Sequence, residues 1–539
     1  MKAVLRLVLA QVRRDRWQLA VWIAGIALLG FATAAAVAAQ FGDESARAAI
    51  IAVAAANPAF LFLRGIPDGT GLGSVVFFQG YAFTAVLAGL MNTFLVIRHT
   101  RGDEEAGRAE LLGAGPLSRA VPLAATLILA SAANTVLAAC VAAGYVLAGL
   151  PGSGSVVAGL AVGAVGLFFA AVAAGTAQLL PSARAANGAA AALVGAAYLV
   201  RGIGDAMGTP SPALDAVASG WPSMLSPIGW GQRSRPFAAA GIGPVLVLAA
   251  AAAVLAAVAV LYRQRRDLGE SVLPEHPGPA RASAAGRTLT GLAWRLQRST
   301  LAGWFAAAAV LGSVAGAFGP VVAREVEGNP SLTDLISRLV PGTEVGVVDV
   351  FGAALMGIAG VLAAAAGVQA VLRLRAEESE GRAELLLAGS VSPARWMGAS
   401  LTVAALSTTV VCAAAGTAAA VCLALTGSPP AGAAVFLAAG LAHAPAALVF
   451  LAAAALIFAV VPRHTVQLGW GLLAAGLVLG QFGELLRLPA WLQNVSPFRY
   501  SSALPVEDLN VTAAGILLSV AAAGALAAAR LLHKRDLTP

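Results

Sequence analysis

The chain has 539 residues, of which 59% are hydrophobic and only 11% charged, and its net charge is +8. A soluble domain carries roughly 25% charged residues, because its surface must face water. The composition therefore excludes a soluble globular protein and suits a chain that faces lipid. The positive charge does not indicate nucleic-acid binding, since the basic residues lie in short segments between apolar runs. Only three cysteines occur, all in apolar stretches, which argues against a disulfide framework or a thiolate metal site.

The first sixteen residues predict an amphipathic helix in the cytoplasmic interface. Lys2, Arg6 and Arg13 recur at helical spacing against aliphatic residues, as in helices that lie on a membrane surface. The charged start of a signal peptide is the alternative. The apolar run that follows, residues 17–40, is too long for a signal core.

Twelve apolar runs are long enough to cross a bilayer, which needs about 20 residues each. They begin near Trp17, Val75, Val121, Val156, Ala189, Gly241, Leu301, Val350, Met397, Ala433, Gln467 and Val511. With both termini cytoplasmic, the inner segments hold 25 of the 34 basic residues and the outer segments nine. This imbalance follows the positive-inside rule, so we expect a multi-pass protein of the cell membrane with both termini in the cytoplasm.

Residues 263–290 are rich in arginine and proline and predict a cytoplasmic linker between two halves. The halves are residues 1–262 and 291–539. The segment Leu292–Leu296 predicts a second, shorter interfacial helix, so the second half begins as the first does. The expected fold is all-α, with about 12 transmembrane helices in two six-helix repeats, each preceded by an interfacial amphipathic helix.

An internal repeat supports this division. Residues 101–112 read RGDEEAGRAELL and residues 375–386 read RAEESEGRAELL, at an offset of 274. Both copies lie between the second and third predicted spans of their half. Matching elements have the same orientation, so the repeat is parallel.

Three further pairs of segments occur at similar offsets. Trp22 matches Trp304 in the first span of each half. The other matches are residues 204–205 with 483–484, at the outer end of the fifth span, and residues 226–227 with 496–497, before the sixth.

Each repeated loop can form a short charged helix. Glu104 precedes Arg108 by four residues, as Glu378 precedes Arg382, and this order supports a helix. Such a helix can dock into a partner; the alternative is a solvated turn that keeps its charges out of the membrane. Retention of the pattern in both halves favours the partner contact.

Major-facilitator transporters also have twelve helices in parallel halves, with a Gly/Asp/Arg motif in this loop. Here Asp103 stands four residues before Gly107, one more than that motif allows, and the loop is acid-rich. The acids Asp205, Asp349 and Glu484 lie near the outer ends of spans, whereas proton coupling favours an acid at mid-membrane. His443, inside the tenth span, is interpreted as a packing residue.

Two outer segments, residues 210–237 and 487–510, are rich in aromatic residues and poor in charge. They are either ordinary loops or short helices that enter the outer interface and close the pathway, and the aromatics favour the second. The candidate gate residues are Ser226, Pro227, Trp230, Ser496, Pro497 and Tyr500. Gln79, Asn92, Asn134 and Gln369 are the polar residues that could line an apolar pathway, although small-residue faces equally suit close helix packing.

Together the first helix, the charged loop and the Ser-Pro segment resemble ABC-2 type permeases. RHTRGDEEAGRAELL, LSPIGWGQRSRPF and GLAWRLQRSTLAGW are similar to the duplicated actinobacterial permeases of the tetronasin type, which export polyketide antibiotics and other drugs. In the second half VSPFRY corresponds to LSPIGW of the first, but it lacks the glycine and the tryptophan. The two outer segments are therefore expected to differ.

The resemblance implies the membrane subunit of an ATP-driven exporter of amphipathic or hydrophobic small molecules. A P-loop needs a lysine after its glycines, and neither Lys2 nor Lys534 has that context. The chain is then no enzyme by itself, holds no catalytic or metal site, and depends on two copies of a separate ATPase that binds ATP and Mg. The implied ATPase-docking (coupling) residues are Arg101, Glu104, Gly107, Arg108, Glu110, Arg375, Glu378, Gly381, Arg382 and Glu384.

Two other classes of function are alternatives. The runner-up is an ion-coupled secondary drug transporter with twelve helices. An intramembrane enzyme acting on lipid is a weaker hypothesis, because no cluster of aspartates, histidines or nucleophiles occurs on the spans.

Overall fold

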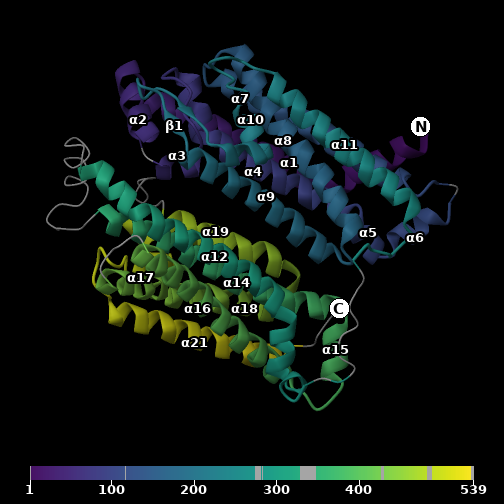
Figure 1. Cartoon of the computed structure of the whole chain (residues 1–539). Helices are drawn as coiled ribbons and strands as arrows, with labels where there is room; N and C mark the ends of the chain where they lie inside the picture. The colour runs from purple at the N-terminus through teal and green to yellow at the C-terminus, as the bar shows by residue number, and fades with distance from the viewer. Residues whose placement is uncertain are drawn as a thin grey trace. The chain divides into compact units, whose positions relative to one another are not determined.

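The computed structural model describes residues 2–273 except 57 and 116, residue 281, and residues 283–327, 347–425, 430–481 and 489–535. The chain divides into two compact units, Met1–Pro277 and Gly278–Pro539. Both are bundles of long helices (Figure 1). Eleven helices of the described residues are long and apolar enough to cross a membrane, so the chain is an all-α, multi-pass membrane protein.

The first unit contains six of these helices. The first, α1, is followed by the short helices α2 and α3, and the last, α11, by a loop. One two-residue hairpin pairs Thr209 with Ala218 and Pro210 with Val217. The elements are α1 Lys2–Gln40, α2 Glu44–Ala56, α3 Pro58–Arg64, α4 Leu72–Arg98, α5 Arg101–Glu105, α6 Arg108–Gly113, α7 Val121–Leu147, α8 Gly152–Leu179, α9 Ala183–Ala206, β1 Thr209–Pro210, β2 Val217–Ala218, the 3-10 helix η1 Trp221–Leu225, α10 Pro227–Gln232 and α11 Gly243–Arg265.

The second unit contains the other five candidate spans. Its fourth span consists of two helices, α17 and α18, which meet at His443. The elements are η2 Ala285–Arg287, α12 Leu289–Glu327, α14 Val347–Ser379, α15 Arg382–Leu387, α16 Pro393–Leu425, α17 Pro430–Ala442, α18 Ala444–Val460, η3 Pro462–His464, α19 Thr465–Gln481, α20 Ala490–Gln493, η4 Pro497–Tyr500 and α21 Val511–His533.

The expected span near Gln467 corresponds to α19. This helix has 17 described residues and ends where residues 482–488, outside the described part, begin. A count of twelve spans therefore stays a prediction.

The expectation of separate interfacial helices is wrong. The first sixteen residues belong to α1, one helix of 39 residues, and Leu292–Leu296 belongs to α12, also 39 residues long. No glycine or proline occurs between residues 2 and 24, so nothing interrupts the helix before the span. Its first turns pack on the bundle instead: the Gln11 side chain donates to Thr126 of α7 at 3.0 Å.

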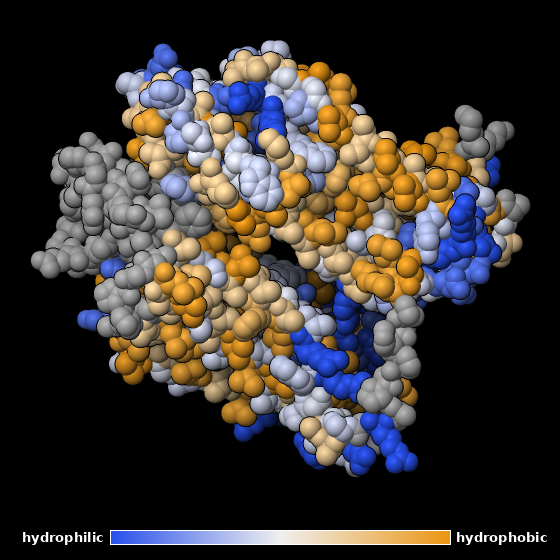
Figure 2. Space-filling view, viewed as in Figure 1, coloured by the Kyte–Doolittle hydropathy of each residue, from blue (hydrophilic) through white to orange (hydrophobic). Residues whose placement is uncertain are grey.

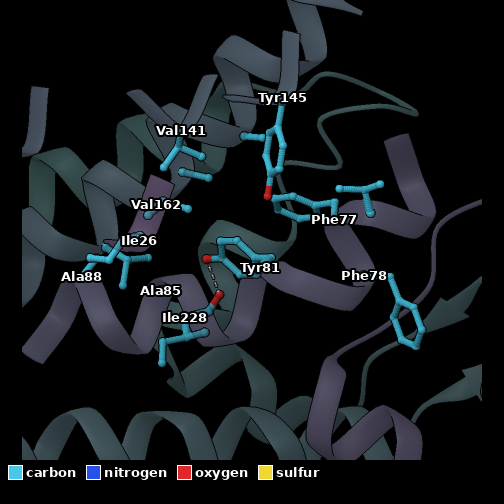
Figure 3. Packing of buried hydrophobic residues seen from close by; sticks show 14 of the residues in the cluster. Ile26, Phe77, Phe78, Tyr81, Ala85, Ala88, Val141, Tyr145, Val162 and Ile228 are labelled. Carbon is cyan, nitrogen blue, oxygen red and sulfur yellow. Dashed lines mark hydrogen bonds between the residues drawn. The ribbon is translucent and has the colours of Figure 1, made fainter. Parts of the chain in front are cut away.

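Small residues let the helices of the first unit approach closely. Gly159 and Gly163 of α8 lie so near to α7 that a Cβ would stand 2.2 Å from the Ala138 carbonyl oxygen and 2.9 Å from that of Asn134. Apolar side chains fill the remaining space, as Figure 3 shows around Tyr81 and Tyr145. Close packing of this kind is one of the forces that drive helix association in lipid.

Asn92 of α4 and Asn134 of α7 form a reciprocal pair inside this packing. Each amide donates to the other's oxygen, at 3.0 and 2.7 Å, and to a carbonyl of its own helix. Their hydrogen-bonding groups are thus used within the bundle. The side-chain oxygens of Gln79 and Gln369 are used as well, since Gln79 accepts from Arg64 and Gln369 from Trp304, the latter at 2.6 Å. The four polar residues considered for a pathway instead hold helices together.

Replacing Asn92 by leucine should lower stability, because the Asn134 amide then loses its partner while remaining buried. The expected loss is about 1–3 kcal/mol, measured as a lower unfolding midpoint of the purified chain in detergent. The double replacement of Asn92 and Asn134 should cost less than the sum of the single changes. Thr408 stands at Asn134's position in the second unit and its hydroxyl has no partner among the described residues. Thr408→Val is therefore a control without loss, and equal losses in all variants would contradict the pairing.

Candidate functional site: the repeated charged loops

Each unit carries its repeated loop as a short helix beyond the end of its second span. In the first unit α5 leads through Gly107 to α6, and in the second α14 leads through Gly381 to α15. The two glycines have matching left-handed conformations, φ 69° and ψ −1° against φ 71° and ψ 0°. We call the bundle end that carries α6 or α15 the loop end, and Figure 2 shows hydrophilic surface gathered there in each unit.

The expected pairing of Glu104 with Arg108, and of Glu378 with Arg382, is wrong. The left-handed glycine lies between the two residues and interrupts the helix, so they do not share one helix. Arg108 instead pairs with Asp103, at 2.7 Å, and Arg382 with the equivalent acid Glu377, at 2.9 Å. These bonds raise the pKa of Arg382 above its usual value, chiefly through the hydrogen bond to Glu377.

The acids Glu104 and Glu378, which do not pair with Arg108 and Arg382, point into the bundle. The Glu104 side chain is 8% exposed and pairs with Arg101 and with two arginines at the end of α11, Arg263 at 3.3 Å and Arg266. We call this group the first arginine clamp.

The second arginine clamp has the same plan. The Glu378 side chain is 2% exposed and pairs with Arg375, at 3.4 Å, and with Arg535, just after α21. In both units, therefore, the loop acid is tied to the C-terminal end of the sixth span.

The clamp arginines also bind the end of the fourth span. Arg266 donates to the Ala177 carbonyl of α8 at 3.1 Å, and Arg535 donates to the Phe458 carbonyl of α18 at 2.7 Å. These carbonyls belong to the last turn of a helix, where cations are favoured. Burial lowers the pKa of Arg266, and the charge of Glu104 opposes that effect. In each unit, therefore, one arginine joins the acid of the charged loop, the end of the fourth span and the end of the sixth span.

Sequence reasoning missed Arg263, Arg266 and Arg535. They lie more than 150 positions from the acids they bind, and no periodicity connects them. The available signal was an arginine directly after the last span of each half, at residues 266 and 535.

Each short helix, α6 and α15, carries one strongly exposed leucine. Leu111 is 80% exposed and Leu385, at the same place in the repeat, is 81% exposed. Glu110 and Glu384 precede them and are exposed as well. Each loop thus presents an exposed apolar side chain on a short charged helix.

The first charged loop has additional ion pairs with α1. Arg14 of α1 pairs with Asp103 at 2.8 Å, and Asp15 is bonded by His99 at 2.6 Å. At an offset of 282, set by Trp22 and Trp304, the second unit has the uncharged Leu296 and Gln297. The two loops thus differ in how α1 and α12 support them.

Alanine at Gly107 or Gly381 should loosen α6 or α15 without affecting the spans. A Cβ at either position would meet nothing within 4 Å, so the cost is that of the left-handed conformation, about 1–2 kcal/mol. Hydrogen exchange of the α6 or α15 amides should accelerate while the spans keep their protection. Gly149 has φ 87° and equal space around it, so Gly149→Ala controls for backbone strain elsewhere. Unchanged exchange in α6 and α15 would contradict this role.

The outer segments lie at the opposite end of each unit and repeat one hydrogen-bond plan. Ser226 donates to the Ala197 carbonyl of α9, and Ser496 donates to the Gly476 carbonyl of α19, both at 2.7 Å. Each hydroxyl also caps a short helix that begins at the following proline, Pro227 or Pro497.

The aromatic residues of these segments have equivalent contacts. Trp230 donates through Nε1 to the carbonyl of Met224, and Tyr500 donates through its hydroxyl to that of Asn494. Each acceptor lies six residues before its donor. The replacement of tryptophan by tyrosine therefore preserves the contact.

The segments differ where the sequence lost its glycine. At Gly229 a Cβ would stand 2.3 Å from the Ser223 carbonyl oxygen, whereas Arg499 occupies this position in the second half. The first segment forms the α-helix α10 and the second only the 3-10 helix η4. In the first, Tyr81 of α4 also donates to the Ile228 carbonyl at 2.9 Å (Figure 3).

Asp205 forms a buried ion pair with Arg201 at 3.0 Å, and both side chains are fully buried. Ser219 and Gln232 also donate to this carboxylate. The expected counterpart of Asp205, Glu484, lies outside the described residues. The interpretation of His443 as a packing residue agrees with its position, since a Cβ on Gly360 would stand 2.7 Å from the histidine side chain.

Comparison with known proteins gives the family. The chain is 33% identical over 534 residues to the multidrug efflux system permease protein Rv1217c of Mycobacterium tuberculosis, and the match covers 97% of this chain and 93% of that protein. Residues 287–532 also match the model of the C-terminal domain of the multidrug efflux system permease Rv1217c. The match extends over both units, their charged loops and their outer segments, and the chain thus belongs to the family of the multidrug efflux system permease Rv1217c.

Proposed function

We propose that this chain is the membrane-spanning subunit of an ABC-type exporter that moves amphipathic or hydrophobic small molecules out of the cell. The observation that carries the proposal is the pair of equally exposed leucines, Leu111 and Leu385, on short helices that follow the clamped acids Glu104 and Glu378. An apolar side chain kept exposed at one place in both repeats suits insertion into a partner protein.

The partner that fits these two helices is a separate ATPase in two copies. Two equivalent docking helices suit two equivalent subunits, and this chain lacks the lysine context of a P-loop. ATP and Mg would then be bound by the partner, and the chain would not be an enzyme by itself. The related protein is named the permease of an efflux system, which agrees with partner subunits.

The clamps suggest how such a partner would act on the spans. A movement passed from α6 or α15 to the neighbouring acids Glu104 and Glu378 would pull on the ends of the fourth and sixth spans, because Arg266 and Arg535 join these acids to both ends. In this proposal the loop ends and both termini face the cytoplasm. The segments around Ser226 and Ser496 close the pathway on the outer side.

Ion-coupled drug efflux is the alternative, and the energy source distinguishes the two. Inverted membrane vesicles containing the permease and its copurifying ATPase should accumulate a fluorescent lipophilic drug when ATP is added. Accumulation should continue after a protonophore has dissipated the proton gradient, because ATP hydrolysis supplies the energy directly. Loss of accumulation with the protonophore, and indifference to ATP, would favour the secondary transporter.

The subunit count follows from the duplication. Both candidate docking helices are in one chain, so native mass spectrometry of the active complex should show one permease with two ATPase subunits. An active species with two permease chains would contradict this count even if ATP drives transport.

A further inference from the structure

We propose that the first unit holds a binding site for a small amphipathic molecule bearing hydrogen-bond donors, in a cavity behind the docking helix α6. The cavity has a volume of about 320 Å³, at the lower end of the range for small-molecule sites. It lies at the loop end, between α1, α5, α6, α7 and the last residues of α8 and α11.

Its wall combines apolar side chains with polar and charged ones, a lining that suits an amphipathic ligand. Leucines form much of the apolar part: Leu7, Leu112, Leu117, Leu123 and Leu268. An apolar body of a ligand would contact the docking helix and the ends of the spans at once.

Several polar groups around the cavity lack partners among the described residues. Gln178 is 3% exposed and its Oε1 has no partner, and Oε1 of the half-buried Gln11 has none either. His99 is also 3% exposed, but its Nδ1 lies 3.8 Å from the Asp103 carboxylate. Both glutamines line the cavity. Buried polar groups are normally hydrogen-bonded, so the two glutamine oxygens indicate a ligand that supplies the missing bonds.

The charged groups on the wall are already used. Arg119 and Arg263 pair with Asp267 and Glu104, and Asp103 pairs with arginines. The free atoms of the two glutamines are acceptors, which favours a ligand with N–H or O–H donors over an anion.

The glutamines and the histidine of the lining are particular to the first unit. At Gln11 and Gln178 the equivalent positions of the second unit are Ala293 and Ala459, and at His99 the second unit has Arg373. Three alignments give these equivalent positions. The tryptophan pair aligns Gln11, the carbonyls bound by the clamp arginines align Gln178, and the loop repeat aligns His99. Docking and clamping therefore do not require the lining, since the second unit does both without it.

Ligand protection of a cysteine at the cavity mouth tests the site. In a chain whose three native cysteines are replaced by alanine, Ser118→Cys places a thiol on the exposed rim of the cavity. Ethidium, an amphipathic fluorescent molecule with two aryl amino groups, should slow maleimide labelling of this thiol several-fold. Ser392→Cys, at the equivalent position of the second unit, is the matched control and should label at the same rate with and without ethidium.

The glutamines provide the second comparison. Adding Gln11→Leu and Gln178→Leu should abolish the protection, while Gln297→Leu should preserve it. Gln297 is a buried glutamine of the second unit whose Oε1 also lacks a partner among the described residues. Unprotected Ser118→Cys at ethidium concentrations up to its solubility limit, or protection that persists without the glutamines, would overturn the proposal. The test uses the permease without an ATPase, so its result is independent of the proposed energy source.

Discussion

Replacing Leu111 and Leu385 together by glutamate should abolish ATP-driven export while the chain remains folded and inserted. Both side chains are about four-fifths exposed, so the folded state loses little by the change. A partner pocket that receives a leucine would have to desolvate a carboxylate instead. The loss expected at a central interface residue is at least about 2 kcal/mol for each site, roughly a 30-fold weaker association.

The single variants separate the two docking helices. If each helix binds one ATPase, Leu111→Glu and Leu385→Glu should each leave a complex with one ATPase, visible by native mass spectrometry. Leu273 lies after α11, outside the candidate spans, and is 53% exposed, so Leu273→Glu controls for added surface charge. Export at the normal rate by a well-expressed double variant would remove the docking assignment and leave the alternative of a solvated loop.

The repeat explains why much of this architecture was predictable. Six identical residues, Gly107–Leu112 and Gly381–Leu386, fixed the offset of 274. The structure then places equivalent ion pairs at equivalent residues, such as Asp103 with Arg108 and Glu377 with Arg382. Hydropathy alone predicted the candidate spans, because every lipid-facing helix needs a long apolar run.

The ion pairs within the charged loops were harder to predict from the sequence. The spacing of Glu104 and Arg108 predicts a pair only if the helix is continuous. The repeated glycine between them has a left-handed conformation in both units. A glycine retained inside a charged helical pattern was therefore the sign of a break, and with a break the acid becomes free to bind elsewhere.

Long-range polar contacts could not be derived from periodicity. Asn92 meets Asn134 across two helices, and Arg201 of α9 donates to the Phe62 carbonyl of α3. Which faces of two helices meet depends on packing of the whole bundle, and a single sequence does not define that. The continuity of α1 was missed for another reason: charge marks where a helix leaves lipid, but only glycine, proline or a cap ends it.

The buried acids Glu104 and Glu378 make the strongest stability prediction. Removing Glu104 leaves Arg101, Arg263 and Arg266 close together and largely buried without a counter-charge. Breaking a buried ion pair by removing one partner costs about 3–5 kcal/mol. Glu104→Ala should therefore lower the unfolding midpoint and the yield of inserted protein, and a charge reversal to arginine should do so more severely.

Glu378→Ala should have the same direction and a smaller effect, because only Arg375 and Arg535 lose their partner. Glu110 lies on the exposed surface of α6, so Glu110→Ala is the control and should leave the midpoint unchanged. A double-mutant cycle then tests the clamp itself. If Glu104 acts through Arg266, adding Arg266→Gln to Glu104→Ala should restore part of the lost stability, since it removes one uncompensated charge. Strictly additive losses would mean that the two side chains act independently, and that the end of the sixth span is not tied to the docking loop through this pair.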